Sequence, residues 1–255
     1  MNIVVFGSGN IATHLATSFH SAGHNILQVY SKTSANARAL ADAVSAVSLA
    51  HISDVNPKAD LYLIAVSDSA ITTLSNSLPP DLQGMVVHCS GATPMTVLDR
   101  FRNYGVIYPP QSLNKTVAAD ISGIPFALEA NTAANLDSLQ QFMEPIAPQS
   151  FACNSQQRLA LHIAAVFVNN FPNALYQIAQ QVLEKENLPF DLLRPIILET
   201  AQKVQNNLPK QVQTGPAQRN DRNTINTHLN FLAYSNTVTE IYQCITDFII
   251  KSRDK

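Results

Sequence analysis

Residues 2–12 read Asn-Ile-Val-Val-Phe-Gly-Ser-Gly-Asn-Ile-Ala and contain the strongest structural signal in the chain. The apolar run Ile3–Phe6 is typical of a short strand that is buried on both faces of a parallel sheet. Gly7 to Gly9 interrupt this run, and apolar residues recur at helical spacing from Ile11 onward. The order of strand, glycine turn and helix matches the G-x-G-x-x-A form of the dinucleotide-binding fingerprint. The alternative is an ordinary glycine-rich turn between a strand and a helix.

The residue types in this turn each have a physical role in holding a pyrophosphate. Gly7 permits the tight turn, Gly9 lets the phosphates approach the backbone, and Ala12 lets the helix pack close to the strand. The free N–H groups at the start of the helix attract the anion. The turn therefore predicts cofactor contacts from Gly7, Ser8, Gly9, Asn10, Ile11 and Ala12.

Strand and helix patterns alternate along the first part of the chain. Strands are expected at residues 25–30, 60–66, 85–88 and 105–108, and a last strand–helix–strand segment between residues 124 and 152. This alternation favours an α/β fold with a doubly wound parallel sheet. After Cys153 the strand signals vanish, and helical stretches remain at residues 156–185, 191–205, 224–231 and 236–250. We therefore expect a dinucleotide-binding Rossmann domain over residues 1–152 and an all-helical domain for substrate binding and dimerisation over residues 153–255.

Composition excludes several classes of partner. Only 13% of the residues are charged, the net charge is −2, and there is no basic run that would favour a nucleic acid or an anionic membrane. Cys89, Cys153 and Cys244 lack the spacing of metal ligands and are expected to be free thiols in a reducing compartment. We expect no metal, no signal peptide and no membrane span, and hence a cytoplasmic protein.

The turn after the second expected strand bears on the type of dinucleotide. An NAD site usually places Asp or Glu there, where the carboxylate binds the ribose 2′-hydroxyl. This chain has Ser31, Lys32 and Thr33 instead, and their cation and hydroxyls suit a 2′-phosphate. The sequence therefore favours NADP over NAD, and the alternative is a plain turn with Lys32 in water.

Polar residues follow two later strands, at the edge of the sheet where doubly wound folds bind ligands. We expect Val66, Ser67, Asp68 and Ser90 to line the nicotinamide half of the cofactor. Asp68 is equally well explained as the N-cap of the next helix. His88 can be a core histidine whose hydrogen bonds are satisfied, so Ser90 is the better candidate to offer a hydroxyl to a substrate.

The stretch from Leu159 is apolar on most faces, and it predicts a central, buried helix. His162, Asn169 and Asn173 form one polar stripe on it, beside Asn170, and must find partners or line a cavity. Pro172 removes one helical hydrogen bond and predicts a kink. The stripe can line a substrate cleft, or its members can make structural hydrogen bonds.

The last candidate is the loop Gln213–Asp221, in which Gly-Pro marks a rigid turn. Arg219 can bind a carboxylate or phosphate of a substrate through two hydrogen bonds, or it can form a structural ion pair with Asp221. Asp221 is also well placed to cap the helix that follows.

The glycine turn followed by Asn10-Ile11-Ala12 resembles the opening of pyrroline-5-carboxylate reductases, in the phosphogluconate and β-hydroxyacid dehydrogenase superfamily. The whole chain is similar to a bacterial family of Rossmann-like proteins with a C-terminal helical domain of unknown function, whose members are often named as NADP oxidoreductases. The segments that carry this likeness are 65–68, 88–91, 110–113, 161–171 and 214–221. The resemblance implies a Rossmann domain, a helical dimerisation domain and a cleft between them, but no substrate.

One feature of that superfamily is missing. β-Hydroxyacid dehydrogenases carry a catalytic lysine four residues before an asparagine on the long helix, whereas Val166 and Asn169 occupy those positions here. His162 is then the best local candidate for acid–base chemistry, since its unperturbed pKa lies near neutrality. Ser90, Asn169, Asn170 and Arg219 complete the set of candidate catalytic residues.

These observations support two hypotheses of different class. The first is an NADP(H)-dependent oxidoreductase that acts on a small molecule and forms a homodimer through its helical domain. The second is a non-catalytic NADP(H)-binding sensor or interaction protein, which the missing lysine motivates because a Rossmann domain alone implies binding only. A third reading, hydride exchange between NADP and a deazaflavin, fits the fold neighbourhood but no particular residue.

Overall fold

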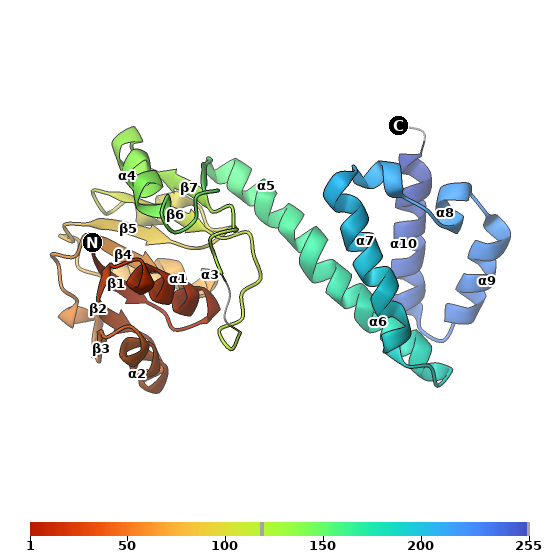
Figure 1. The fold of residues 1–255 in the computed structure, drawn as a ribbon, viewed down its shortest axis with the longest axis horizontal. Coiled ribbons are helices and arrows are strands. Elements are labelled where there is room, and N and C mark those ends of the chain that lie inside the picture. Colours follow the sequence, from red (N-terminus) through yellow and green to blue (C-terminus); the bar gives the residue numbers. More distant parts are fainter. Residues whose placement is uncertain (118–119, 254–255) are drawn as a thin grey trace. The chain divides into compact units, whose positions relative to one another are not determined.

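The computed structural model describes residues 1–117 and 120–253, which divide into two compact units, Met1–Asn170 and Phe171–Lys255. The first unit contains an eight-stranded sheet with the order β3-β2-β1-β4-β5-β6-β7-β8 (Figure 1). Its strands are β1 (Asn2–Phe6), β2 (Asn25–Tyr30), β3 (Val47–Leu49), β4 (Leu61–Ile64), β5 (Met85–His88), β6 (Tyr104–Tyr108), β7 (Ala127–Ala130) and β8 (Phe151–Ala152). Its α-helices are α1 (Asn10–Ser21), α2 (Ser34–Ala43), α3 (Asp68–Ser77), α4 (Ala133–Met143) and α5 (Ser155–Ala165).

The sheet is parallel from β3 to β6, as the alternation of strands and helices predicted. Strand β7 breaks the pattern, because it pairs antiparallel with β6, and β8 then pairs parallel with β7. The short 3-10 helix Met95–Leu98 lies between β5 and β6. Pro94 is in extended backbone and precedes that helix.

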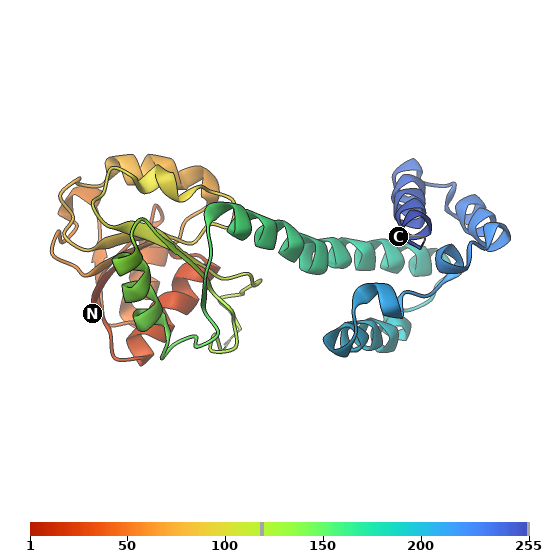
Figure 2. The ribbon, with the colours of Figure 1, turned by 90° about the horizontal axis from the view of Figure 1, so that it is seen from above.

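Two apolar layers cover the faces of the sheet, and Figure 2 shows α3 on one side and α1 and α4 on the other. Alternate residues of β1 point into opposite layers: Ile3 and Val5 pack under α1 and α4, and Val4 and Phe6 pack under α3. All four side chains are fully buried, as expected of a strand that is apolar on both faces. This central position of β1 fixes the glycine turn at the carboxyl edge of the sheet.

The long helical stretch predicted from residue 156 is a continuous run of helix, and its α-helical hydrogen bonding is interrupted once. Helix α5 continues as a π-helical segment, Val166–Asn170, and then as α6 (Phe171–Lys185). Pro172 has no N–H to donate to the carbonyl of Val168, so the α-helical bonding pattern cannot pass through this point. The sequence predicted a kink at Pro172, and the structure has a π-helical segment directly before that region. The prediction of a central, buried helix from Leu159 is wrong within the chain, because Arg158 is the one buried residue of α5 and α6 has none.

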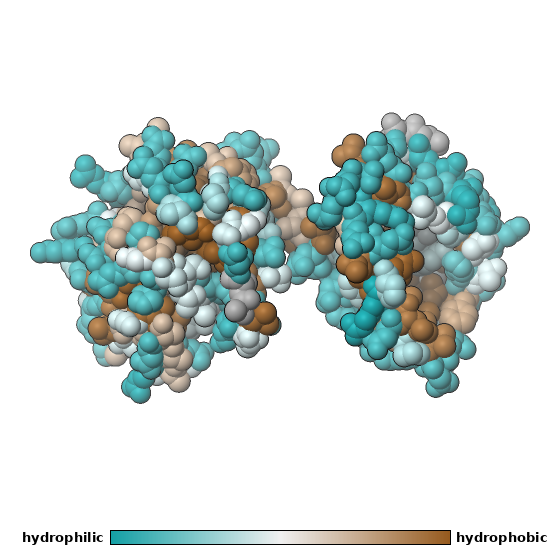
Figure 3. Space-filling model, in the orientation of Figure 1, coloured by the Kyte–Doolittle hydropathy of each residue, from teal (hydrophilic) through white to brown (hydrophobic). Residues whose placement is uncertain are grey.

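The second unit consists of helices with a sparse core. They are α6, α7 (Arg194–Asn206), α8 (Pro216–Arg219), α9 (Arg222–Leu232) and α10 (Asn236–Ser252). Its buried residues are Ala217, Ile225, Leu232, Val238 and Thr246. Large apolar side chains such as Leu198, Phe231 and Phe248 are exposed, and Figure 3 shows apolar surface on this unit. None of the described helices is long and apolar enough to cross a membrane.

His88 ends strand β5 inside the core and is fully buried. Its Nδ1 accepts a hydrogen bond from the backbone N–H of Ser90 at 3.1 Å, so the neutral ring carries its proton on Nε2. Nε2 is buried and has no hydrogen-bond partner among the described residues. Burial, with a smaller contribution from the charge of Arg158, lowers the pKa of His88 from 6.5 to about 3.

The lowered pKa of His88 predicts a loss of stability in mild acid. Between pH 6.5 and about 3 the unfolded chain binds a proton at His88 and the folded chain does not, so the free energy of unfolding falls as the pH falls. The contribution is about 1.4 kcal/mol per pH unit well below 6.5. His88→Asn keeps a hydrogen-bond acceptor near the Ser90 N–H and removes the titration.

We expect the free energy of unfolding of His88→Asn to depend less steeply on pH than that of the wild type, as measured by urea denaturation between pH 7 and pH 4. His20→Asn is the matched control, since His20 is exposed. Identical pH slopes for wild type and His88→Asn would contradict the prediction.

Candidate functional site

A cavity of about 850 Å³ lies at the carboxyl edge of the sheet in the first unit. Its wall includes residues at or just after the ends of β1, β2, β4, β5 and β6, together with further residues of α3. The residues from the strand ends are 7–11, 30–32, 65–70, Cys89 and 111–113. The parallel order β2-β1-β4-β5-β6 brings these loops to one edge, although they are far apart in the sequence. This is where open α/β sheets bind ligands.

The glycine turn has the geometry that a pyrophosphate site needs. Gly7 has φ +122°, and a Cβ at that position would lie 2.1 Å from the carbonyl oxygen of Ala65, so no other residue fits. A Cβ at Gly9 would meet no atom within 4 Å, and this open space lies on the cavity wall. Ala12 is buried against the strand, as expected of the third small residue. The turn therefore leaves the backbone of Gly9 accessible to a ligand.

The start of α1 presents backbone N–H groups without an intrahelical acceptor beside the same cavity. Gly9 is the N-cap residue and supplies no side-chain cap, and the first intrahelical bond runs from the N–H of Thr13 to its carbonyl. The N–H groups of Asn10, Ile11 and Ala12 precede that bond and have no intrahelical acceptor. The first turn carries no acidic residue. An anion placed there gains both the N–H groups and the positive end of the helix dipole.

The loop after β2 places Ser31 and Lys32 on the cavity wall, and their contact with a cofactor stays a prediction. The hydroxyl of Ser8 donates to the hydroxyl oxygen of Ser31 at 2.8 Å, which ties the glycine turn to this loop. Thr33 is the N-cap residue of α2 and is absent from the described lining. Of the described residues that line the cavity, Asp68 is the one carboxylate, and it follows β4 rather than β2. This part of the cavity wall therefore contains a cation and a hydroxyl.

Val66, Ser67 and Asp68 line the cavity after β4. Ser67 is the N-cap residue of α3, and Asp68 is the first residue of the helix. The alternative explanation of Asp68 as the N-cap is therefore wrong by one position. Its carboxylate lies in the first turn, where the helix dipole favours a negative charge.

Ser90 is 4% exposed and is absent from the described lining of the cavity, although its neighbour Cys89 lines it. The hydroxyl oxygen of Ser90 accepts hydrogen bonds from the backbone N–H groups of Ala92 and Thr93 at 3.2 and 2.9 Å. The side chain thus shapes the loop after β5. A direct contact of Ser90 with cofactor or substrate stays a prediction.

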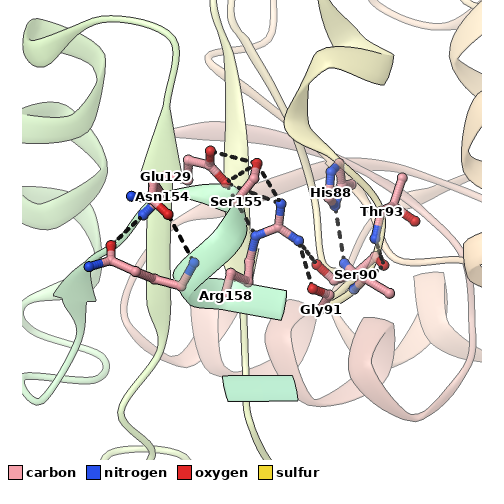
Figure 4. A network of polar contacts seen from close by, with 10 residues as sticks. His88, Ser90, Gly91, Thr93, Glu129, Asn154, Ser155 and Arg158 are labelled. Atoms are coloured by element: carbon pink, nitrogen blue, oxygen red, sulfur yellow. Dashed lines mark hydrogen bonds and ion pairs between the residues drawn. The ribbon is translucent and has the colours of Figure 1, made fainter. Parts of the chain in front are cut away.

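Arg158 is hydrogen-bonded to this loop, and sequence reasoning did not single it out (Figure 4). Its guanidinium is 1% exposed and donates to the carbonyl oxygens of Ser90 and Gly91 at 2.7 and 3.0 Å. It also forms an ion pair with Glu129 of β7 at 3.1 Å, and both residues bond the hydroxyl of Ser155. A charged residue beside the apolar stretch from Leu159 was the available signal, but nothing in the sequence paired it with Glu129.

His162 lies one turn after Arg158 on α5 and meets two other elements. Its Nδ1 is 3.0 Å from the hydroxyl oxygen of Tyr108, the last residue of β6. A Cβ at Gly91 would lie 2.6 to 2.7 Å from Cγ, Cβ and Nδ1 of His162, so the histidine packs where only glycine leaves room. His162 is therefore held by the loop after β5 and by the end of β6.

The remaining candidate residues are all exposed to solvent in their own units. Asn169 and Asn170 are exposed residues of the π-helical segment. Arg219 is the last residue of α8 in the helical unit and is also exposed. It lowers the pKa of Asp221, although hydrogen bonds from Thr224 lower it more, and the described residues show no ion pair between Arg219 and Asp221. Asp221 caps α9 through the N–H of Thr224, as predicted.

Two family models match the chain. A Rossmann-like domain matches residues 1–110, and a domain of unknown function, DUF2520, matches residues 124–249. A search of curated proteins found no match. Among solved structures, a putative NADP oxidoreductase from Bacteroides fragilis is 37% identical, with 98% of each chain covered and a TM-score of 0.87.

More distant structures share the fold at low identity. An imine reductase from Myxococcus stipitatus in complex with NADP⁺ is 15% identical, with 99% of this chain and 95% of that chain covered and a TM-score of 0.69. A reductive aminase from Aspergillus terreus, in complex with NADPH4, cyclohexanone and allyl amine, is 15% identical over 98% of this chain and 94% of that chain, with a TM-score of 0.74. The chain therefore belongs to the family of proteins that join a Rossmann-like domain to the C-terminal domain DUF2520.

Proposed function

We propose that the protein is an NADP(H)-dependent oxidoreductase that acts on a small molecule with a carbonyl or imine group. The observation that carries this proposal is the cavity of about 850 Å³ at the carboxyl edge of the sheet, which is lined by the glycine turn. Its length along β2, β1, β4 and β5 suits an extended dinucleotide rather than a single phosphate. The names of the relatives support the same reaction class.

The residues present fit the parts of the cofactor. The open backbone at Gly9 and the N–H groups at the start of α1 hold the pyrophosphate. Ser31 and Lys32 hold a 2′-phosphate, and the residues after β4 and β5 lie beside the nicotinamide. When bound, NADPH would supply a hydride to the carbon of a C=O or C=N bond and become NADP⁺, and the heteroatom would take up a proton from solvent water.

Binding of NADPH tests the cavity directly. Gly9→Asp places a carboxylate where the phosphates approach, so we expect the Kd for NADPH to rise at least tenfold, a loss of about 1.4 kcal/mol or more. Isothermal titration calorimetry measures this Kd. Gly123→Asp is the control, since Gly123 also has open space around its Cα but lies outside the described lining of the cavity. Full NADPH affinity in Gly9→Asp would refute binding at the glycine turn.

Lys32 tests the preference for NADP over NAD. Loss of a charge-assisted hydrogen bond costs about 1.5–3 kcal/mol, so Lys32→Asp is expected to weaken NADPH binding about tenfold to a hundredfold. The Kd for NADH is expected to change much less, because NADH lacks the 2′-phosphate. Lys58→Asp makes the same charge change outside this cavity and should leave both constants unaltered. Equal losses for NADPH and NADH in Lys32→Asp would argue against a 2′-phosphate contact.

The second candidate is an NADP(H)-binding sensor without turnover. The observation that favours it is the absence of lysine between residues 155 and 184, where β-hydroxyacid dehydrogenases carry their catalytic lysine. The two candidates are separated by incubating the protein with NADPH and a panel of ketones, aldehydes and cyclic imines. Consumption of NADPH by any of them, lost in Gly9→Asp, supports the oxidoreductase, and NADPH binding without turnover supports the sensor.

The helical unit supports a further part of the proposal, a homodimer formed through its apolar surface. Helix α6 buries none of its side chains within the chain, although Leu175, Ile178 and Val182 recur along one face. This face lines an apolar groove of about 470 Å³ together with residues of α9 and α10. Exposed apolar surface of this extent marks an interaction site in a water-soluble protein. A second copy offers the same surface, which satisfies the symmetry of a two-fold interface.

We expect light scattering after size-exclusion chromatography to give twice the 27.8 kDa of one chain at micromolar concentration. Leu175→Glu places a charge in the apolar groove and should shift the protein toward the monomer. Val47→Glu is the control, because Val47 is an exposed apolar residue of the sheet unit. A monomeric wild-type protein with full helix content would refute the dimer.

A further inference from the structure

In the hydrogen bond between Tyr108 and His162, the surroundings determine which side chain is the donor. The hydroxyl oxygen of Tyr108 lies 3.0 Å from Nδ1 of His162, and the two rings meet edge to face at 78°. Tyr108 is 6% exposed, and its hydroxyl has no other hydrogen-bond partner in residues 1–117 and 120–253. The contact is therefore the main hydrogen bond available to a nearly buried phenol.

A buried phenol acts as a donor, because its hydroxyl proton otherwise has no acceptor. Burial raises the pKa of Tyr108, and the nearby carboxylate of Asp68 raises it further, whereas the charge of Arg158 opposes this. The phenol therefore keeps its proton at neutral pH. Nδ1 of His162 must then present its lone pair, so the proton of the neutral ring lies on Nε2.

The other side of the imidazole is left open. Cβ, Cγ and Nδ1 pack against Gly91, where any side chain at position 91 would collide with them. Nε2 makes no hydrogen bond within the described chain and is not among the fully buried atoms without a partner, and His162 itself is partly exposed. His162 packs against Gly91, which lies two residues after Cys89 on the cavity wall.

We infer that Tyr108 is a positioning residue whose hydroxyl donates to Nδ1 of His162, holds the histidine in its Nε2–H tautomer and so makes Nε2–H a fixed hydrogen-bond donor. The role of this donor rests on the proposed function: it binds the oxygen or nitrogen of the substrate's double bond. Negative charge develops on that atom as hydride reaches the carbon, and a fixed donor stabilises it. The tautomer itself does not depend on the reaction.

The geometry gives a reason for the unusual fit at Gly91. Arg158 fixes the carbonyl groups of Ser90 and Gly91, Gly91 fixes the ring plane of His162, and Tyr108 fixes its protonation. Three elements far apart in the sequence thus orient one imidazole.

The tautomer can be measured without substrate. In long-range ¹H–¹⁵N spectra of the uniformly labelled protein at pH 8, the His162 ring is assigned by its disappearance in His162→Gln. We expect the wild type to show the Nε2–H form alone. Tyr108→Phe should add a measurable fraction of the Nδ1–H form, and Tyr104→Phe, on the same strand, should not. An Nδ1–H form in the wild type, or an unchanged ring spectrum in Tyr108→Phe, would overturn the inference.

Kinetics separates this inference from the proposed function. With any carbonyl or imine that the protein reduces, Tyr108→Phe is expected to lower kcat about tenfold and leave the Kd for NADPH unchanged. Tyr104→Phe should alter neither. A normal kcat in Tyr108→Phe would contradict the donor role. If no compound is reduced, the proposed function fails while the spectra still decide the tautomer.

Discussion

The buried guanidinium of Arg158 is the constraint on which the candidate site depends. A charge that is 1% exposed is stable only if its donors are satisfied, and Arg158 meets this requirement with Glu129, Ser155 and two backbone carbonyls. Removing Glu129 would leave an uncompensated buried charge, which typically costs about 3–5 kcal/mol. The ion pair therefore holds β7, the start of α5 and the loop after β5 in one arrangement.

That arrangement determines what the loop after β5 can do. Because Arg158 takes the carbonyl oxygens of Ser90 and Gly91, and the Ser90 hydroxyl caps Ala92 and Thr93, the polar atoms of the loop are largely used for structure. The loop contributes to the site mainly through the missing side chain of Gly91, which gives His162 its place. A serine that sequence reasoning chose for its hydroxyl thus serves to shape the loop that orients a histidine.

The parts of the site that could be predicted are those in which sequence neighbours act together. The glycine turn, the start of α1 and the Ser31–Lys32 loop each depend on a few consecutive residues, and the structure places them on one cavity. The Arg158–Glu129 pair and the Tyr108–His162 contact join residues 29 and 54 positions apart, so no local pattern reveals them. The antiparallel β7 was missed for the same reason, since strand direction depends on a pairing that residue order does not encode locally.

The proposed histidine donor also limits the kind of double bond that suits this site. A neutral imidazole with its proton on Nε2 donates a hydrogen bond but gives up that proton only at high cost, because an imidazolate would remain. It therefore polarises an acceptor with a free lone pair, such as a ketone, an aldehyde or a neutral imine.

A protonated imine presents an N–H of its own to Nε2–H, so two donors would face each other. Lysine in the same place would carry a positive charge and repel the protonated imine more strongly, whereas a neutral donor discriminates by hydrogen-bond polarity alone. A site that lacks lysine and has Tyr108 beside His162 therefore selects its substrate by the direction of a hydrogen bond and not by a fixed charge.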